Sequence, residues 1–346
     1  MGTGNIGSFV YKELKSHPEL YPEGIDVYDI SNGFDLSDPQ VIEQCLIGKN
    51  AVIATTPYFL NYEIAKKAAE LNVVYFDVTE DVKTTEEISK FDLTVPFFPQ
   101  CGLAPGMVSI IANELAKEFE TVEEIKIRVG ALPQTPNNVM KYNFTWSTIG
   151  LINEYCNPCM ELVDGEVVWR SPLSNHETLR VCGMDLEAAT TSGGVGSLIK
   201  SWEGKAKTIN YKTLRYPGHY DYMRFLLHDL KMSENKDLFE KLFDKAIPKI
   251  ENDMIVIFIA ASGYKSGRFG QKTYEKIIHP IEGNELAQFG IDMNKASAIQ
   301  VATVHGLLAV FDSWLNGNVK KVGIVRQEDL NFEDISLSVF SEVYFK

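Results

Sequence analysis

Three glycines near the beginning of the chain have the spacing of a phosphate-binding turn. Gly2, Gly4 and Gly7 form the pattern Gly-x-Gly-x-x-Gly. In this pattern the first glycine permits a tight turn, the second lets the backbone approach a pyrophosphate, and the third lets a helix pack closely on a sheet. The helix that follows can hold phosphates at its N-terminus. The spacing predicts a dinucleotide site formed by Gly2, Gly4, Asn5, Ile6 and Gly7; the alternative is a surface turn before an ordinary helix.

The end of the next predicted strand carries the residue that would choose between the two nicotinamide dinucleotides. Asp29 follows Gly7 at close to the ~20-residue spacing expected for the acidic residue that binds the ribose hydroxyls. Because a carboxylate at this place repels a 2′-phosphate, the sequence favours NAD as the cofactor over NADP. Asp26 and Asp35 are alternatives to Asp29 in this role.

Two further strand ends are predicted to lie along the same cofactor crevice. Thr55, Thr56 and Tyr58 follow an apolar strand run, and we expect them to contact the ribose or the nicotinamide; Tyr58 could instead pack in the core. Asp77 ends the following strand, where its carboxylate would border the cofactor and could accept a proton from an amine or orient a water. A helix cap or a surface carboxylate is the alternative for Asp77.

These residues require an alternation of strands and helices, which the first hundred residues display. The apolar periodicity predicts helices over residues 6–16, 39–46 and 62–71, and strands over residues 25–29, 51–54 and 73–76. Strands and helices in turn imply parallel strands joined by crossovers in one sheet. The sequence therefore predicts an α/β fold with a Rossmann-type, dinucleotide-binding domain over residues 1–100.

A proline-rich stretch, residues 96–107, separates this domain from longer predicted strands. A helix is predicted over residues 106–119, a hairpin turn at Asp164-Gly165, and strands over residues 124–132, 141–146, 207–214, 254–261 and 272–280. This pattern favours an α+β substrate domain with a mixed or antiparallel sheet over residues 101–290. Residues 291–346 form a third segment with a long apolar helix, predicted over residues 296–315.

Composition and charge exclude several classes of partner. The 346 residues include 47 acidic and 33 basic side chains, a formal net charge of −14. Such a chain repels phosphate backbones, so we expect no nucleic-acid partner. The longest strongly apolar run, residues 254–262, is far shorter than the ~20 residues that span a bilayer, and no signal peptide is evident, so no membrane association is expected.

The cysteines indicate a reducing environment. The chain has five, an odd number, which favours free thiols and a cytoplasmic location. Cys156 and Cys159 have the spacing of a metal or redox pair, but neither a second pair nor a suitably spaced histidine accompanies them, so we predict no metal site.

Several motifs occur in an order that resembles one family. They are Gly2–Gly7, Cys101–Met107, Phe144–Ser147, Gly150–Tyr155, Thr191–Gly194, Thr213–His219 and the tail Val325–Asp329. Together they resemble the saccharopine dehydrogenase-like family, most closely its L-lysine 6-dehydrogenase branch. The resemblance implies a Rossmann domain, a substrate domain inserted before a helix that returns to the Rossmann domain, and NAD(P)-dependent chemistry at a C–N bond. It does not fix the substrate, because members act on lysine, saccharopine and polyamine-like amino acids.

Amine oxidation by hydride transfer sets requirements that particular side chains can meet. The nitrogen must be neutral, so the site must desolvate an ammonium group whose pKa is near 10.4, or give it a base. The substrate α-carboxylate needs a bidentate donor, for which Arg215, at the end of a predicted strand, is the candidate; an exposed salt bridge is its alternative. His219 begins the next helix and could shuttle protons, or merely cap that helix.

The remaining candidates surround Arg215 in the predicted substrate domain. Glu154 could hold the α-amino group of the substrate, with Tyr155 beside it, or could lie on a surface face. Thr191 and Ser192 belong to a polar turn that can offer hydroxyls, and Trp146 could line the pocket or pack in the core. At the junction of the domains, the backbone of Gly102 and Ala104 is expected to lie along the cofactor.

These observations favour an NAD(P)-dependent amino-acid dehydrogenase that oxidatively deaminates the side-chain amine of lysine to the 6-semialdehyde. A homodimer is expected, through strand edges of the substrate domain. One alternative is a saccharopine dehydrogenase-like enzyme that acts on a lysine-derived secondary amine. Another is a nucleotide-binding relative without catalytic activity.

The glycine pattern also raises a question about the first strand. Such a turn normally follows the central strand of its sheet, yet only Met1 precedes Gly2. About five or six residues, a mean strand length, are therefore expected to be missing. Either the native start lies upstream, or the printed chain binds NAD weakly.

Overall fold

The computed structural model describes residues 1–18, 24–282 and 295–346, which divide into two compact units. The first unit comprises Met1–Met107, Ile281–Ala296 and Gln300–Lys346. The second unit comprises Val108–Pro280 and Ser297–Ile299. The predicted boundary between residues 290 and 291 lies outside the described residues.

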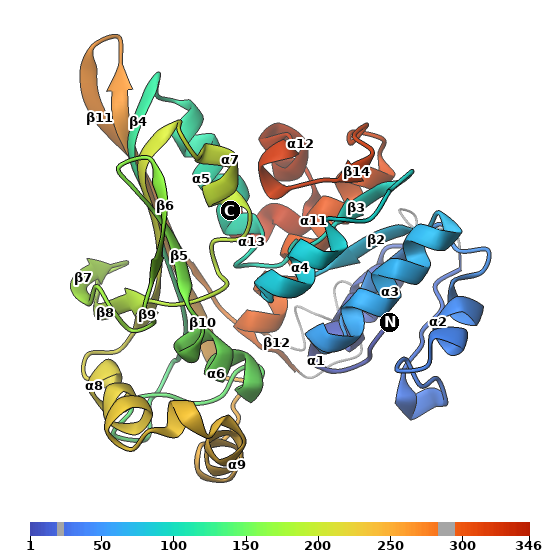
Figure 1. The fold of residues 1–346 in the computed structure, drawn as a ribbon, viewed down its shortest axis with the longest axis horizontal. Helices are drawn as coiled ribbons and strands as arrows, with labels where there is room; N and C mark the ends of the chain where they lie inside the picture. Colours follow the sequence, from blue (N-terminus) through green and yellow to red (C-terminus); the bar gives the residue numbers. More distant parts are fainter. Residues whose placement is uncertain (19–23, 283–294) are drawn as a thin grey trace. The chain divides into compact units, whose positions relative to one another are not determined.

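The first unit is built on a parallel sheet with helices between its strands (Figure 1). Among the described residues the strand order is β1 (Ala51–Ala54), β2 (Val74–Asp77), β3 (Pro96–Phe98) and β14 (Gly323–Ile324). The helices that precede or connect the first three are α1 (Asn5–Ser16), α2 (Pro39–Leu46), α3 (Tyr58–Leu71) and α4 (Val82–Ile88). The predicted parallel sheet with alternating helices is confirmed.

The helix starts follow local chemistry. Asp38 caps α2, because its carboxylate accepts a hydrogen bond from the backbone N–H of Gln40 (2.8 Å), and Pro39 occupies the first turn, where its missing N–H is no loss. The helix α3 begins at Tyr58, four residues before the predicted start, directly after Pro57. Tyr58 therefore lies in the first turn of a helix rather than in a loop.

Residues 25–29 are not a strand, which corrects the prediction. The backbone N–H of Gly2 donates to the carbonyl of Tyr28 (2.9 Å), and the N–H of Thr55, after β1, donates to the carbonyl of Met1 (2.9 Å). Met1 and Gly2 thus lie between Tyr28 and the end of β1. A single hydrogen bond to Tyr28 is not a ladder, so this extended segment lacks the repeated pairing that defines a strand.

The helix α11 (Ala298–Leu315) is the long apolar helix that the sequence predicts. It ends before Gly317, whose φ of 74° suits a helix C-terminus. By length and composition α11 could cross a membrane, but 72% of it is buried inside the protein, and the core helix of a globular protein meets the same criteria. The elements after β14 are η4 (Gln327–Asp329), α12 (Phe332–Ser336), η5 (Val339–Ser341) and α13 (Glu342–Phe345).

The second unit contains a large mixed sheet. Among the described residues it has eight strands, in the order β11 (Arg268–Ile278), β10 (Asp253–Lys265), β4 (Thr121–Pro133), β9 (Ala206–Arg215), β5 (Cys159–Val163) and β6 (Glu166–Arg170), with β7 (Glu177–Val181) and β8 (Met184–Thr190) attached through β9. Only β4 and β9 pair in parallel; the other pairs are antiparallel. The predicted mixed sheet is confirmed.

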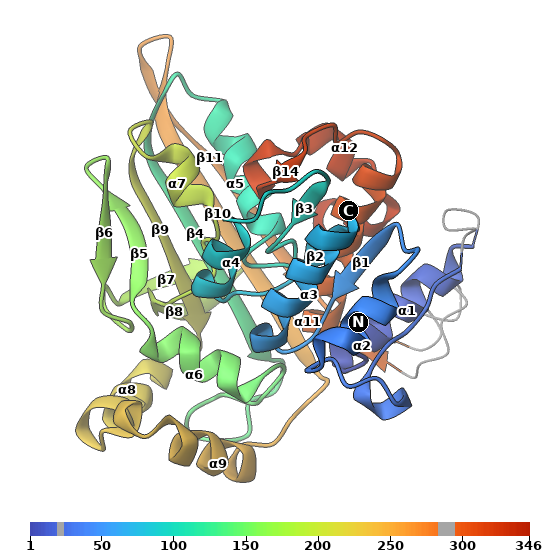
Figure 2. The ribbon, with the colours of Figure 1, turned by 45° about the vertical axis from the view of Figure 1, so that its right-hand side comes forward.

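The helices of the second unit occupy two places (Figure 2). In both views α5 (Met107–Lys117) and α7 (Leu198–Trp202) lie along one side of the large sheet, while α6 (Thr148–Cys156), α8 (His219–Arg224) and α9 (Lys236–Ala246) gather at one end. The residues that pack between α6, α8 and α9 form a core cluster with Tyr142, Phe144, Tyr155 and Tyr220. The short elements η1 (Ile30–Asn32), η2 (Phe225–Asp229), η3 (Met232–Glu234), β12 (Ile281–Glu282) and β13 (Lys295–Ala296) complete the description.

One strand prediction of the second unit holds and another is wrong. At the turn between β5 and β6, Asp164 and Gly165 have φ values of 52° and 85°, the left-handed pair that a tight hairpin turn needs. Residues 141–146 are not a strand: only Phe144 makes a bridge, to Lys249. Tyr142 and Phe144 alternate with polar residues, and both of their rings are buried in the core cluster beside the helices.

Candidate active site

The glycine turn in the first unit has the geometry that its three glycines imply. Gly2 has a φ of 85°, which only glycine adopts without strain. A Cβ atom on Gly7 would lie 1.8 Å from the carbonyl oxygen of Gly2, so the helix α1 starts too close to the turn for any side chain. Gly4 is exposed, and a Cβ there would meet nothing within 4 Å. The open backbone at Gly4 and the N-terminus of α1, with exposed Asn5 and half-buried Ile6, fit a dinucleotide pyrophosphate.

The hydroxyls of Thr55 and Thr56 both make hydrogen bonds inside the first unit. The hydroxyl of Thr55 donates to the carbonyl oxygens of Met1 (3.1 Å) and Gly2 (3.0 Å), so Thr55 holds the glycine turn against the end of β1. The hydroxyl of Thr56 donates to the side-chain oxygen of Asn61 (2.7 Å). Their predicted contacts with the ribose or nicotinamide would have to be made by their remaining atoms.

Asp29 lies against the glycine turn. Its carboxylate accepts hydrogen bonds from the backbone N–H groups of Thr3 (2.8 Å) and Ser31 (2.9 Å), which lower its pKa to about 2. It is therefore ionised at neutral pH. Because a carboxylate has about four acceptor sites, Asp29 can still accept hydrogen bonds from ribose hydroxyls beside the turn. The residues present thus fit a nicotinamide dinucleotide.

Asp77 ends β2, as predicted, but it lies in the interior of the first unit. Its side chain is fully buried, and its carboxylate accepts hydrogen bonds from the hydroxyl of Tyr75 (2.8 Å) and the backbone N–H groups of Thr79 (3.1 Å) and Gln100 (2.8 Å). Burial raises the pKa of Asp77 to about 6, against the effect of these three donors. The carboxylate joins the end of β2 to the turn after β3. Its predicted role in proton transfer and in cofactor contact stays a prediction.

The backbone of Gly102 lies close to the helix α11. A Cβ on Gly306, in α11, would lie 2.5 Å from the carbonyl oxygen of Gly102, and that oxygen also accepts a hydrogen bond from the N–H of Met107 (2.9 Å). Gly306 must therefore be a glycine, and Gly102 is buried, with a Cβ there 3.3 Å from the side chains of Thr303 and Val78. The predicted contact of the Gly102 backbone with the cofactor stays a prediction. Ala104 is half-buried, so its backbone stays a candidate for the cofactor.

In the second unit, β9 directs a row of polar side chains to one face. Side chains of a strand alternate between faces, so Tyr211, Thr213 and Arg215 share one face. Arg215 has only 2% of its surface exposed. Its Nε donates to the hydroxyl of Tyr155 (2.6 Å), one Nη1 hydrogen goes to the carbonyl of Leu214 (2.9 Å), and Nη2 lies 3.6 Å from the carboxylate of Glu154.

Glu154 is the negative partner of this buried pair. It is 8% exposed, and its carboxylate accepts a hydrogen bond from the hydroxyl of Thr213, which also contacts the hydroxyl of Thr191 (2.7 Å). Burial raises the pKa of Glu154 above its ordinary value, although Arg215 works in the opposite direction. The predicted residues Arg215, Glu154 and Thr191 therefore lie together.

Tyr155 connects Arg215 to His219. The Nδ1 atom of His219 lies 2.9 Å from the carbonyl oxygen of Met140, which can only accept, so this nitrogen carries the proton. The other ring nitrogen then accepts the hydroxyl hydrogen of Tyr155 (3.1 Å). His219 is fully buried, and burial together with Arg215 lowers its pKa to about 3.

In this structure the ring is enclosed and both of its nitrogens are engaged. The predicted proton transfer by His219 stays a prediction. Its contacts make it a residue that orients Tyr155 and, through Tyr155, Arg215.

The other predicted substrate residues lie around this cluster. The backbone N–H of Ser192 donates to the carbonyl of Glu154 (3.0 Å), which ties the polar turn to α6. In the same turn, a Cβ on Gly194 would lie 2.2 Å from the ring of Tyr211, so only glycine fits there. Trp146 is half-buried and packs against the core cluster.

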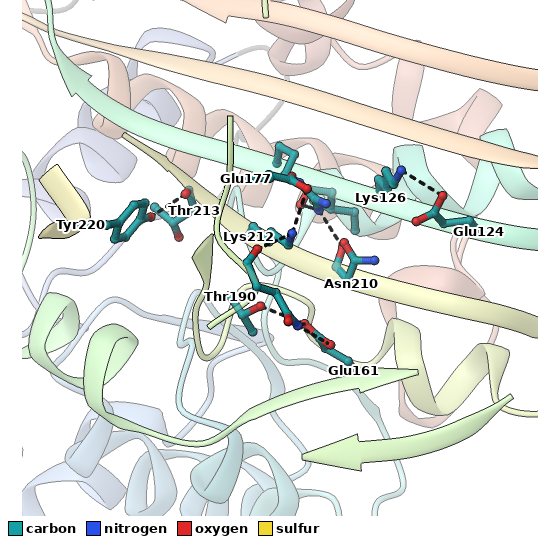
Figure 3. Close-up of polar contacts among 12 residues, drawn as sticks. Glu124, Lys126, Glu161, Glu177, Thr190, Asn210, Lys212, Thr213 and Tyr220 are labelled. Carbon is teal, nitrogen blue, oxygen red and sulfur yellow. Dashed lines mark hydrogen bonds and ion pairs between the residues drawn. The ribbon is translucent and has the colours of Figure 1, made fainter. Parts of the chain in front are cut away.

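Sequence reasoning missed four residues of the cluster: Tyr142, Tyr211, Thr213 and Tyr220. The ring of Tyr142 lies over the guanidinium of Arg215, 5.1 Å from its centroid. The hydroxyl of Tyr220 donates to the carbonyl of Thr213 (2.6 Å), a contact that Figure 3 shows. Counting back along β9 in steps of two from Arg215 would have found Thr213 and Tyr211; nothing local in the sequence points to the other two.

A second buried charged network starts from the intervening residues of β9 (Figure 3). Lys212 donates to the carboxylate of Glu177 (2.8 Å), which also binds the guanidinium of Arg128 on β4. Glu161 accepts a hydrogen bond from Thr190 nearby (2.9 Å). Lys212, Glu177 and Arg128 are paired with one another, whereas Glu161 pairs with Arg170 (3.4 Å). By alternation, Lys212 points away from Arg215.

Cysteine, histidine and acidic side chains are the usual ligands of a protein-bound metal ion. In the described ranges, no three His, Cys, Asp or Glu side chains gather as metal ligands. Cys156 and Cys159 are free thiols, and burial raises the pKa of both.

Comparison with known proteins identifies relatives over much of the chain. The family model described as the saccharopine dehydrogenase C-terminal domain matches residues 102–343. The mitochondrial alpha-aminoadipic semialdehyde synthase of Bos taurus is 30% identical over 234 residues, 62% of this chain and 24% of that protein. The Mus musculus protein of the same name is 28% identical over 135 residues, 37% of this chain and 15% of that protein. The chain thus spans about a quarter or less of these curated relatives.

Two solved structures share the fold. Apo saccharopine dehydrogenase (L-Glu forming) from Saccharomyces cerevisiae has a TM-score of 0.72 and 14% identity, over 99% of this chain and 96% of that chain. Homospermidine synthase from Legionella pneumophila, solved in complex with NAD, has a TM-score of 0.57 and 13% identity, over 94% and 80%. These similarities confirm the predicted Rossmann-type α/β fold with a second domain.

Proposed function

Because the chain belongs to the saccharopine dehydrogenase family, we propose that it is a nicotinamide-dependent oxidoreductase acting on the CH–NH group of an amino acid. The leading form is lysine 6-dehydrogenase-like. In that reaction lysine, NAD⁺ and water give the 6-semialdehyde, NADH, ammonium and a proton. The second candidate, favoured by the fold shared with saccharopine dehydrogenase of Saccharomyces cerevisiae, acts on saccharopine or a similar secondary amine.

The observation that carries the proposal is the buried pair of Arg215 and Glu154. Its opposite charges lie 3.6 Å apart, with neither side chain more than 9% exposed. An α-amino acid has the complementary arrangement, with a carboxylate and an ammonium on one carbon. Arg215 would bind the carboxylate and Glu154 the ammonium, so the polar head is fixed and the side-chain amine is left for reaction.

The first unit would supply the cofactor. Gly4 and the start of α1 would hold the pyrophosphate of the dinucleotide, and ionised Asp29 would accept hydrogen bonds from the ribose, which favours NAD over NADP. When bound, the nicotinamide supplies an acceptor for hydride. Thr55 keeps the turn in place, and the protein contributes alignment and exclusion of water.

The test measures the formation of NADH and of NADPH with lysine as the substrate, and then with saccharopine as the substrate. We expect turnover with lysine and NAD, and a change of Asp29 to Asn should raise the relative use of NADP. Turnover with saccharopine alone would favour the second candidate. No turnover with either amine under both coenzymes would refute the proposed function.

A further inference from the structure

We infer that Tyr142 is a further substrate-binding residue, whose hydroxyl and Arg215 together hold the substrate carboxylate. The inference deepens the proposed function and rests on it. Tyr142 stands in the segment that the sequence predicts as a strand and that the structure places in the core cluster instead.

The hydroxyl of Tyr142 is an exception among the buried hydroxyls of the cluster. The side chain is fully buried, and its oxygen makes no hydrogen bond of normal geometry with any described residue. The indole of Trp146 is within weaker reach, but an indole N–H can only donate, so the hydroxyl hydrogen of Tyr142 has no acceptor. The hydroxyls of Tyr155 and Tyr220, equally enclosed, bind His219 and the carbonyl of Thr213. A buried polar atom without a partner is unfavourable, and native proteins keep few of them except where function requires it.

The position of Tyr142 relates this hydroxyl to the two charges of the site. Its ring lies over the guanidinium of Arg215, 5.1 Å away, and near the ring of His219, 5.4 Å between centroids. The phenol also interacts electrostatically with both Arg215 and Glu154. The hydroxyl is therefore part of the Arg215 cluster and not a remote core atom.

The chemistry of the group fits a carboxylate. Burial raises the pKa of Tyr142 well above its ordinary value, so the hydroxyl stays protonated and can donate. Arg215 has five N–H bonds, of which one goes to Tyr155 and one to Leu214, while Nη2 is too far from Glu154 for a normal hydrogen bond. A carboxylate between these donors would receive hydrogen bonds from a cation and a neutral hydroxyl.

The polar character extends along the same segment. The side-chain oxygens of Asn143 and Thr145 are also buried without a hydrogen-bond partner among the described residues. Among the described residues, no hydrogen bond or ion pair joins Asn143 or Thr145 to Arg215 or Glu154, so they are not part of the carboxylate proposal.

The experiment compares Tyr142→Phe with wild type, using lysine and 1,5-diaminopentane, which has the same terminal amine and no carboxylate. Loss of a hydrogen bond to a charged group predicts a roughly 10- to 100-fold higher KM for lysine. The KM for 1,5-diaminopentane should change less than twofold. Since the hydroxyl makes no hydrogen bond of normal geometry and the ring stays, the melting temperature should not fall.

Tyr220→Phe is the matched control. It removes a hydroxyl with a 2.6 Å hydrogen bond from the same cluster, so the melting temperature should fall, and any effect on KM should be equal for both amines. If Tyr142→Phe behaves like Tyr220→Phe, or leaves the KM for lysine within twofold of wild type, Tyr142 is a packing residue and the inference is wrong while the function stands.

Binding measurements separate this failure from failure of the proposed function. Titration calorimetry with lysine and 1,5-diaminopentane does not require turnover. If wild type binds lysine without oxidising it, the function fails, and weaker lysine binding by Tyr142→Phe would still support the inference. Equal lysine binding by both proteins, or none by wild type, would overturn it.

Discussion

Arg215 donates a 2.6 Å hydrogen bond through Nε to the hydroxyl of Tyr155, and this bond fixes the orientation of a guanidinium group that is almost wholly buried. Tyr155 in turn donates to a neutral His219, which is itself oriented by the carbonyl of Met140. The charge of Arg215 is thus positioned by neutral partners, while Glu154 alone opposes it at 3.6 Å. Such an arrangement keeps the cation available for an anion of the substrate.

The first prediction concerns His219. Its pKa of about 3 means that the ring is neutral at any pH where the enzyme would work. His219→Gln supplies an acceptor for Tyr155 and should keep kcat within roughly threefold, whereas His219→Leu leaves that hydroxyl buried without a partner and should raise KM for lysine and lower the melting temperature. Steady-state kinetics and thermal melting test this. Loss of turnover in both variants at normal stability would instead make His219 a proton-transfer group.

The second prediction concerns the planar guanidinium group of Arg215. Arg215→Lys keeps the charge but not the planar donors that hold Tyr155 and a carboxylate together. We expect KM for lysine to rise by at least roughly tenfold, with a smaller change in kcat. Arg180→Lys is the control, because Arg180 lies 70% exposed in an ion pair with Asp185 and should change nothing measurable. Equal KM values in Arg215→Lys and wild type would contradict the carboxylate role.

The third prediction is a pH dependence of stability at Asp77. Its pKa is about 6 in the folded protein against 3.8 for the ordinary side chain, so the folded state binds the proton more tightly. The stabilisation by this proton is complete below pH 3.8, and it is lost as the pH rises through 6. Relative to wild type, Asp77→Asn should therefore gain up to about 3 kcal/mol in free energy of unfolding between pH 4 and pH 7. Denaturant titrations with parallel pH profiles for the two proteins would refute this.

The fourth prediction separates two glycines of the turn. Gly7→Ala places a Cβ 1.8 Å from the carbonyl oxygen of Gly2, so the turn must open and the melting temperature should fall along with NAD affinity. Gly4→Ala meets no protein atom within 4 Å and has a compatible φ of −63°, so the melting temperature should hold while the Kd for NAD rises. Unchanged NAD affinity in Gly4→Ala would remove this turn from the cofactor site.

Local patterns in the sequence predicted the framework of the first unit well. The run at residues 51–54, the Asp38-Pro39 start of α2 and the glycine spacing are signals carried by neighbouring residues. Such local signals do not reveal the surroundings of Asp77. The sequence places a carboxylate at a strand end, but its burial depends on the backbone of Gln100, 23 residues away, which no local pattern reveals.

The site in the second unit was predicted in part. Arg215, Glu154 and Tyr155 were expected near a substrate, but their mutual hydrogen bonds depend on α6 reaching β9. Residues 141–146 alternate between apolar and polar side chains, as a strand does. In the fold they pair with no strand, apart from the bridge of Phe144 to Lys249, so their apolar side chains pack in the core instead. Tyr142 was missed because the prediction of a strand does not say which residues surround its hydroxyl.

The alternation along β9 has a consequence for how this chain can vary. Thr213 and Arg215 serve one network, while Lys212 serves the other, from adjacent positions of the same strand. An insertion or deletion of one residue within β9 would exchange the two sets, sending Lys212 toward Glu154 and Arg215 toward Glu177. An insertion or deletion inside β9 must therefore involve two residues if both sets are to keep their faces, and single-residue changes of length should be confined to the ends of the strand. Single substitutions can adjust either network on its own.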